Sequence, residues 1–292
     1  MKKSILIIGG SGLVGSTFID LFHEFYDIHL TYNKNTYENG TKIDLISEPL
    51  KIKSIIEKLK PDVVLHTAAH SSVDMCETNH FETDLLHVDV TKNICESCNL
   101  TNSKLIYIST DAVFSGEMNK KYVESDQTNP VNYYGKSKLD AENIILKSSQ
   151  KNVILRSAVI YGWHPRSKFT SWILGALSEN KMVDPFIDQY NSPTLVNDLT
   201  TSINRIIQSD LSGLFHAAGK TCINRYDFAR KLAQKFRLNE DLVKPVTVNE
   251  KKQIASRPTS SCLDSSKLEN QISFNFKNIN EGIEFIYKQS KL

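Results

Sequence analysis

The chain has 292 residues, which is enough for one large α/β domain with an attached lobe or for two domains. Hydrophobic residues make up 40% and charged residues 23% of it, as in soluble globular proteins, and the net charge of +2 gives no reason to expect binding to nucleic acid or to a membrane surface. No apolar stretch approaches the roughly 18 residues of a membrane span. Five cysteines, an odd number, argue against a disulfide framework and favour a reducing, cytoplasmic environment.

The first predicted strand, Ser4 to Ile8, runs into glycines spaced Gly-x-x-Gly-x-x-Gly and then into a helix. Because this short apolar run is followed by no small-residue cleavage site, we expect a strand and not a signal peptide. The glycines allow a tight turn, close approach of a pyrophosphate and packing of helix on strand, and the helix N-terminus offers amides to phosphates. A plain β-α turn is the alternative. We expect a dinucleotide to bind at Gly9, Ser11, Gly12, Leu13, Val14 and Gly15.

A second strand is predicted from Ile28 to Tyr32. Its end, about 20 residues past the glycines, is where a carboxylate would hold the ribose hydroxyls of NAD. The residues here are Tyr32, Asn33 and Lys34, so a 2′-phosphate would be tolerated. We therefore expect NADPH as the cofactor, with NADH as the second choice; a solvated lysine without a role is the alternative.

Strands and helices then alternate, which predicts a Rossmann-type, doubly wound parallel sheet with right-handed crossovers. The expected elements are a helix over 48–60, a strand over 63–66, a helix over 81–99, a strand over 105–109 and a strand over 153–156. Ligands bind beyond the carboxyl ends of such strands, so the glycine turn and the end of the fourth strand should share one cleft. The further cofactor-binding residues that we expect are Asp44, Leu45, Thr67, Ala68, Ala69 and Ser109.

The fourth strand ends in Ser109-Thr110-Asp111, and after a polar loop a helix is predicted from Tyr134 to about Lys147. Positions i and i+4 share a helix face, so Tyr134 and Lys138 should point the same way. A lysine ammonium beside a phenol lowers the tyrosine pKa from its ordinary value of about 10, which suits a carbonyl/alcohol interconversion. Thr110 would supply a second hydrogen bond to the same oxygen. The pattern alone is common, since it recurs at Tyr287 and Lys291 without supporting residues.

After Tyr161-Gly162 the alternation changes, with helices predicted in 163–182, 196–207, 226–236 and 279–287 and a short strand over 214–217. We find no Pro/Gly linker, so any second lobe should be interleaved with the first. We expect residues 1–162 and 193–212 to form the dinucleotide-binding domain, and residues 163–192 and 213–292 to form a smaller α/β lobe that binds the substrate.

Other groups of cysteines, histidines and hydroxyls in the sequence give little support for a metal site or a hydrolase triad. Cys95 and Cys98 lack a second cysteine pair at ligand spacing, and the histidines of 70–87 lack a companion carboxylate pattern, so no metal site is predicted. Ser109 is not surrounded by a Gly-x-Ser-x-Gly elbow, which argues against a hydrolase triad.

With these residues placed, the chain resembles the extended short-chain dehydrogenase/reductase superfamily. Within it, the chain is similar to the dTDP-4-dehydrorhamnose reductase family, sister to the regulatory β subunit of methionine adenosyltransferase. The resemblance covers nearly the whole chain. The segments that match the family are the glycine turn, Thr67-Ala68-Ala69, Val73-Asp74, Cys76-Glu77, the segments 108–116, 129–138 and 155–162, Asp188-Gln189, Pro193-Thr194, Asp198-Leu199, Arg257-Pro258 and Leu263-Asp264.

The resemblance implies a cytoplasmic enzyme that uses NADPH to reduce the C4 ketone of a nucleotide-linked 4-keto-6-deoxy sugar, for deoxysugar or polysaccharide precursors. Thr110, Tyr134 and Lys138 would be catalytic. Tyr134 would protonate the C4 oxygen, and Lys138 would also hold the nicotinamide ribose hydroxyls. Arg257 would lie near the nucleotide-sugar substrate in the second lobe. A homodimer is compatible with this family.

The chain departs from the family pattern in the sugar pocket. Ala112 replaces a usual tyrosine, Val159 a frequent tryptophan, Lys168 an asparagine and Asn191 a glycine. The expected substrate-contacting residues are Asp111, Ala112, Val159, Lys168 and Arg257. The altered pocket motivates a second hypothesis, a non-catalytic NADP-binding regulatory subunit of methionine adenosyltransferase. An epimerase or dehydratase ranks last, because dehydratases of the superfamily usually place a glutamate acid where this chain has Ala112.

Overall fold

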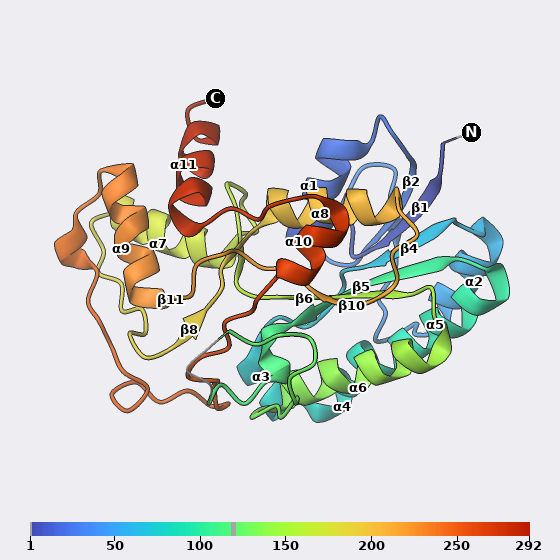
Figure 1. Ribbon diagram of the computed structural model, residues 1–292, viewed down its shortest axis with the longest axis horizontal. Helices are drawn as coiled ribbons and strands as arrows, with labels where there is room; N and C mark the ends of the chain where they lie inside the picture. Colours follow the sequence, from blue (N-terminus) through green and yellow to red (C-terminus); the bar gives the residue numbers. More distant parts are fainter. Residues whose placement is uncertain (1, 118–120) are drawn as a thin grey trace.

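The computed structural model describes residues 2–117 and 121–292. Within them, seven strands form one sheet in the order β10-β6-β5-β4-β1-β2-β3 (Figure 1). The strands are β1 (Ser4–Ile8), β2 (Asp27–Tyr32), β3 (Thr41–Lys42), β4 (Val63–His66), β5 (Lys104–Thr110), β6 (Val153–Ser157) and β10 (Gly213–His216). Every neighbouring pair is parallel, so the predicted doubly wound parallel sheet is confirmed.

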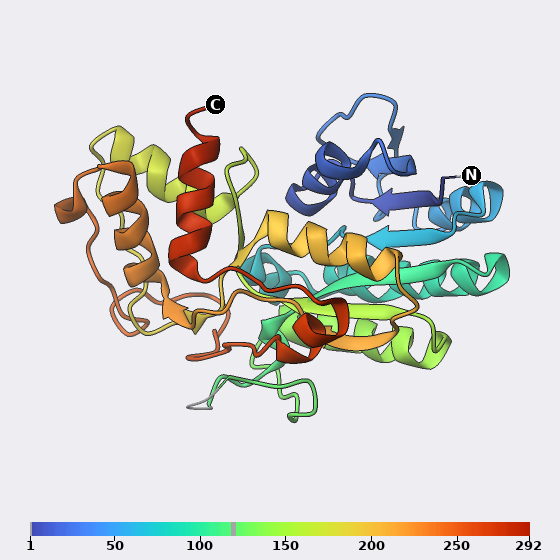
Figure 2. The ribbon, with the colours of Figure 1, turned by 45° about the horizontal axis from the view of Figure 1, so that its top comes forward.

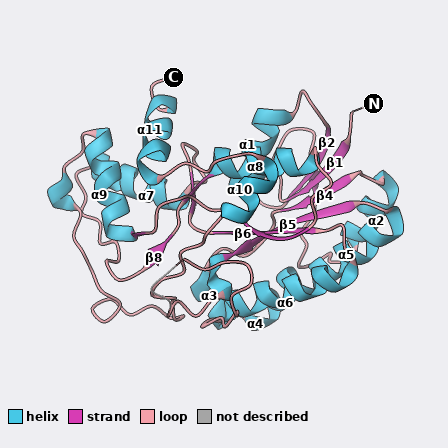
Figure 3. Cartoon of the chain, in the orientation of Figure 1, coloured by secondary structure: helices cyan, strands magenta, loops and turns pink. Residues whose placement is uncertain are grey.

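The apolar strands are buried on both faces, as parallel strands between two helical layers should be. Along β1, Ile5 and Ile7 point into one core cluster while Leu6 and Ile8 point into the other. The first cluster is covered by α1 (Leu13–Phe22), α8 (Val196–Ile207) and α10 (Ser266–Ile272). The second is covered by α2 (Lys51–Leu59), α5 (Val90–Thr101) and α6 (Tyr133–Ser148), which lie on the opposite face in Figure 3.

The helix predicted over 81–99 is longer and less regular than expected. It consists of α4 (His80–Asp84), a π turn (Leu85–Asp89) and α5, and it follows a short helix α3 (Val73–Thr78) that the sequence did not reveal. The π turn contains His87, whose ring bonds to Ser137 of α6 at 2.9 Å and accepts the backbone N–H of His70 at 2.9 Å. A single-turn π bulge of this kind is common near functional sites.

The C-terminal half adds a third apolar cluster beside the sheet, built between helices that lie at the left of Figure 2. It is built by α7 (Lys168–Ser178), α9 (Arg225–Phe236) and α11 (Ile279–Gln289). Two-residue strands connect the regions: β7 (Ile160–Tyr161) pairs with β9 (Thr194–Leu195), and β8 (Tyr190–Asn191) pairs with β11 (Ile223–Asn224). The predicted division into two interleaved domains stays a prediction.

The argument against disulfides was wrong. Cys222 and Cys262 form a disulfide with their Cα atoms 5.5 Å apart, while Cys76, Cys95 and Cys98 are free and buried. An odd number of cysteines shows only that at least one cysteine has no partner within the chain. It does not exclude a disulfide between two cysteines that the fold brings together. Among the described residues no helix is long and apolar enough to span a membrane.

Candidate active site

Tyr134 is held at the end of β5 by the way α6 begins. The side-chain oxygen of Asn132 accepts the N–H of Gly135 at 2.8 Å and so caps the helix. Gly135 packs so closely on the chain after β5 that a Cβ would overlap the carbonyl oxygen of Ala112. The residue after Tyr134 must therefore be glycine, and the first turn of α6 is fixed against residues 110–112.

Lys138 follows one turn later and is buried. Its Nζ donates to the carbonyl oxygen of Ile108 at 2.8 Å and lies 4.0 Å from the ring centre of Tyr107. Burial lowers the pKa of Lys138 to about 7, and the carboxylate of Glu142 opposes this shift. The ammonium thus titrates near neutral pH.

Glu142 lies one helical turn beyond Lys138, on the same face of α6 as Tyr134 and Lys138. It receives Arg156 of β6 through Nη2 to Oε2 at 2.7 Å and through Nε to Oε1 at 3.0 Å, and it also accepts the hydroxyl of Ser109. The side chains of Glu142 and Arg156 are 1% and 4% exposed. Sequence reasoning missed this pair, although the i, i+4 spacing used for Tyr134 and Lys138 continues to Glu142.

The predicted lowering of the Tyr134 pKa was wrong for this structure. Burial raises that pKa above its ordinary value, and the interaction with the Thr110 side chain only partly opposes the shift. Lys138 gives its hydrogen bond to Ile108 instead of the phenol. The spacing argument counted the charge of the lysine but not the desolvation of the tyrosine.

Thr110 and Asp111 form a hydrogen-bonded turn at the end of β5. The Thr110 hydroxyl donates to Asp111 Oδ1 at 3.1 Å and accepts the N–H of Ala112 at 3.1 Å. The other oxygen of Asp111 accepts Asn191 of β8 at 2.8 Å and the Ser261 hydroxyl at 2.5 Å. Asp111, expected to contact substrate, therefore joins β5 to the C-terminal half, and Asn191 at the unusual position is one of its partners.

The glycine turn after β1 has the geometry of a phosphate cradle. Gly9 has φ +84°, in the left-handed region that favours glycine, and a Cβ there would press on the backbone of Ala68 at 2.9 Å. Gly12 N-caps α1 without a side-chain bond, so the first amides of the helix are open to a ligand. A Cβ on Gly15 would meet Gly10 Cα at 2.6 Å, which explains the third glycine.

The other expected cofactor residues lie at neighbouring strand ends. Tyr32 ends β2 and is half-buried, whereas Asn33 and Lys34 after it are exposed. Asp44 and Leu45 follow β3; Leu45 packs in the core, and Asp44 and Lys34 both act electrostatically on His70. After β4, the Thr67 hydroxyl donates to the carbonyl oxygen of Ile8 at 2.9 Å, which brings residues 67–69 beside the glycine turn.

The expected substrate residues are spread over several elements. Ala112 is half-buried, and Val159 has φ +38°, a strained conformation for a β-branched residue. Lys168 begins α7 and donates to Ser71 Oγ at 2.7 Å. Arg257 Nη2 donates to Asp74 Oδ1 at 2.9 Å, and its Nη1 donates to the carbonyl oxygen of Ala255 at 2.7 Å.

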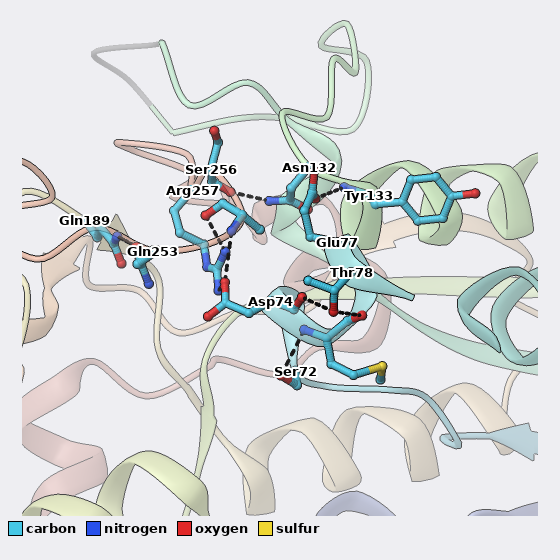
Figure 4. A network of polar contacts seen from close by, with 12 residues as sticks. Ser72, Asp74, Glu77, Thr78, Asn132, Tyr133, Gln189, Gln253, Ser256 and Arg257 are labelled. Carbon is cyan, nitrogen blue, oxygen red and sulfur yellow. Dashed lines mark hydrogen bonds and ion pairs between the residues drawn. The ribbon is translucent and has the colours of Figure 1, made fainter. Parts of the chain in front are cut away.

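Figure 4 shows that the segment 253–257, which contains Arg257, is fastened at several points. Asp74 of α3 accepts both Arg257 and the N–H of Ala255 at 3.1 Å, and Asn132 Nδ2 donates to the Ser256 carbonyl at 2.8 Å. Gln189 donates to Gln253 at 2.5 Å. Asn132 thus caps the helix of Tyr134 and also holds this segment, a double role that the sequence did not indicate.

Two cavities lie on either side of the loop 163–166 and are not lined by Tyr134 or Lys138. One, of about 470 Å³, is lined mainly by apolar groups that include Trp163, Leu174 and Phe236. The other, of about 480 Å³, is lined by polar groups that include Ser16, Asp20 and Arg166. Among residues 2–117 and 121–292, no group of three or more His, Cys, Asp or Glu is arranged to hold a metal ion.

Comparison with known proteins agrees with this geometry. The family model described as RmlD substrate binding domain matches residues 1–292. The dTDP-4-dehydrorhamnose reductase of Aggregatibacter actinomycetemcomitans is 29% identical over 91% of this chain and 92% of its own length. The methionine adenosyltransferase 2 subunit beta of Bos taurus is 29% identical over 92% of this chain and 82% of its own length.

The crystal structure of the dTDP-4-dehydrorhamnose reductase of Bacillus anthracis in complex with NADP superposes with a TM-score of 0.89 at 27% identity, covering 99% of this chain and all of that one. These matches confirm the predicted fold, the predicted resemblance and the predicted class of NAD(P)-dependent oxidoreductase. The chain belongs to the RmlD substrate binding domain family.

Proposed function

We propose that the protein reduces the C4 ketone of a nucleotide-linked 4-keto-6-deoxy sugar with NADPH, and that Thr110, Tyr134 and Lys138 are its catalytic residues. One observation carries the proposal: the start of α6 packs against the end of β5 through Gly135. Tyr134 therefore lies at the carboxyl ends of the strands, where the glycine turn after β1 also lies. Only β4 separates β1 from β5 in the sheet. A dinucleotide and a phenol would therefore meet in one cleft.

The residues present fit the cofactor. The uncapped start of α1 and the positive φ of Gly9 suit a pyrophosphate, which would lie on residues 9–15. The adenosine half would lie by Tyr32, Asn33, Lys34, Asp44, Leu45 and Thr67-Ala68-Ala69, and the nicotinamide half by Ser109, Tyr134 and Lys138. An exposed lysine and no carboxylate at the end of β2 support NADPH over NADH.

In this mechanism the bound cofactor supplies the hydride that reduces C4. The chain supplies the proton: the Tyr134 hydroxyl gives it to the C4 oxygen, and Thr110 donates a hydrogen bond to that oxygen. Lys138, whose pKa lies near 7, would hold the nicotinamide ribose and favour the phenolate that Tyr134 leaves behind. The sugar would lie by Asp111, Ala112, Val159 and Lys168, with Arg257 near the nucleotide.

The proposal also includes a domain division, a cellular location and an oligomeric state. Residues 1–162 and 193–212 would form the cofactor domain, and residues 163–192 and 213–292 the substrate lobe. We expect the enzyme in the cytoplasm, and light scattering would test the homodimer that the family resemblance allows.

The direct experiment adds a series of dTDP-linked 4-keto-6-deoxy sugars to purified protein and follows NADPH absorbance. Turnover with one of them would support the proposal. NADPH binding without turnover on any of them would contradict it. The result would then favour a regulatory subunit, a reading supported by the altered Ala112 and Val159 and by the likeness to the β subunit. Copurification with a methionine adenosyltransferase would test that second function.

A further inference from the structure

His87 connects three parts of the candidate active site. It is 1% exposed and lies in the π turn Leu85–Asp89 between α4 and α5, beside α6 (Figure 1). Its Nε2 accepts the backbone N–H of His70 at 2.9 Å, and its Nδ1 lies 2.9 Å from the hydroxyl of Ser137 in α6. Its ring meets the ring of Tyr134 at 77°, with the ring centres 5.8 Å apart. One buried side chain therefore contacts the segment after β4, helix α6 and the phenol itself.

These hydrogen bonds decide which ring nitrogen of His87 carries the proton. A backbone N–H can only donate, so Nε2 is the unprotonated nitrogen. Burial, together with the charge of Lys138, lowers the pKa of His87 to about 2, so the ring stays neutral and its one proton is on Nδ1. That N–H donates to Ser137 Oγ, and the Ser137 hydroxyl donates to the carbonyl oxygen of Tyr134 at 3.0 Å. A directed chain of hydrogen bonds thus runs from the backbone after β4 to the first turn of α6.

The π turn that carries His87 is itself held in the core. The carbonyl oxygen of His87 accepts the hydroxyl of the buried Thr91 at 2.7 Å, and that hydroxyl lies 3.3 Å from Nε2 of His66 in β4. Because both ring nitrogens of His87 also have partners, the ring cannot turn without breaking two buried hydrogen bonds. His87 is therefore a rigid support for what it touches.

The groups that His87 joins are those that the proposed mechanism has to align. His70 directly follows Thr67-Ala68-Ala69, where we expect the cofactor, and Ser137 directly precedes Lys138. The Tyr134 side chain interacts with Thr110 as well as with His87. Contacts with both residues restrict the orientation of the phenol, and a misplacement of about 1 Å can slow a reaction about 100-fold.

We propose that His87 is a positioning residue that holds the Tyr134 phenol at a fixed place relative to the cofactor-binding segment. This inference rests on the proposed function, since positioning matters for a reaction in which Tyr134 gives a proton. His87 acts through Ser137 and Tyr134 and touches neither the substrate nor the cofactor. Its loss should therefore slow the chemical step and leave ligand binding nearly unchanged.

The kinetic test measures NADPH oxidation with a dTDP-linked 4-keto-6-deoxy sugar. We expect His87→Ala to lower kcat about 10- to 100-fold, with KM and NADPH affinity within a few-fold. His87→Asn, whose amide can donate near the place of Nδ1, should recover part of this loss. Because His87 and Ser137 act in one chain, adding Ser137→Ala to His87→Ala should lower kcat no further.

His216 is the matched control. It is another buried histidine, with Nδ1 3.1 Å from the carbonyl oxygen of Tyr122 and its ring edge-on to Phe114 at 5.7 Å between centres. His216→Ala should lower the urea midpoint, as His87→Ala does, but keep kcat within a few-fold. A folded His87→Ala protein with wild-type kcat would overturn the inference. So would a double variant in which the two losses of kcat multiply, or an equal loss of kcat in His216→Ala.

NMR of the Tyr134 ring tests the inference without turnover. In protein labelled with ring-¹³C tyrosine, where Tyr134→Phe assigns the signals, we expect one sharp set in wild type and broadened or doubled signals in His87→Ala. The signals of Tyr161, in the third apolar cluster, should stay unchanged. Equally sharp Tyr134 signals in both proteins would overturn the inference even in an active reductase. Broadening by His87→Ala in a protein that reduces no nucleotide sugar would refute the reductase and uphold the positioning of the phenol.

Discussion

Glu142 and Arg156 form a buried ion pair one helical turn beyond Lys138, with Arg156 Nη2 2.7 Å from Glu142 Oε2. The pair joins α6 to β6, and the carboxylate is the main group that keeps Lys138 protonated. Removing either partner would leave a buried charge alone, a change that typically destabilises by about 3–5 kcal/mol. The pair therefore links the stability of the sheet to the charge of Lys138, which we propose to be catalytic.

Glu142→Gln should shift the pH dependence of the reaction. The carboxylate raises the pKa of Lys138, so its loss lowers that pKa further below about 7. If the ammonium is the active form, the fall of kcat with rising pH will move to lower pH. Asp140→Asn, which breaks the exposed pair with Lys136, is the matched control. An unchanged profile in a folded Glu142→Gln protein would exclude this coupling.

Lys138 should also make stability depend on pH. Its pKa falls from 10.5 in the unfolded chain to about 7 in the fold, so between these values the unfolded state binds more protons. Stability should thus rise from pH 7 towards pH 10, by at most about 5 kcal/mol for this group. Urea unfolding at several pH values measures it. Lys138→Met should flatten this slope, and an equal slope in the variant would refute the assignment.

Asp74→Asn should weaken substrate binding more than chemistry. Asp74 Oδ1 accepts both Arg257 and the N–H of Ala255, so removing its negative charge weakens the ion pair with Arg257 and loosens the segment 253–257. We expect KM for the nucleotide sugar to rise roughly tenfold, with kcat within a few-fold and NADPH affinity unchanged. Asp184→Asn, which breaks the exposed pair with Lys251, is the control. A kcat effect without a KM effect would argue against this role.

The Cys222–Cys262 disulfide should make a measurable contribution to the free energy of unfolding. It closes a loop with a sequence separation of 40, for which the chain-entropy relation gives about 4 kcal/mol. A reducing agent should therefore lower the urea midpoint of the wild type. It should leave the Cys222→Ser/Cys262→Ser variant unchanged. Five free thiols in the unreduced, denatured wild type would show that the bridge does not form.

Local patterns predicted much of this molecule. The strand from Ser4 to Ile8 and its glycine turn follow from a short apolar run and from residues with few conformational alternatives. The common face of Tyr134 and Lys138 follows from helical spacing alone. The short β7, β8, β9 and β11 escaped prediction because two residues make no periodicity.

The chemistry of the site was harder to predict, because it depends on packing between distant segments. The lowered pKa of Lys138 comes from burial against β5, and the raised pKa of Tyr134 comes from the same enclosure. The contacts of Asn191 with Asp111, and of Arg257 with Asp74, are set by how the C-terminal segments fold back on the sheet. No spacing in the sequence encodes these contacts.

The most direct measurement compares wild type, Tyr134→Phe and the neighbouring Tyr133→Phe in NADPH oxidation with a dTDP-linked 4-keto-6-deoxy sugar. The proposal predicts that Tyr134→Phe lowers kcat by about 10²- to 10⁴-fold while NADPH affinity stays within a few-fold, because only the proton donor is lost. Tyr133→Phe, which loses a hydrogen bond to Asp84 outside the catalytic set, should retain turnover. Turnover by Tyr134→Phe at nearly the wild-type rate would contradict the account.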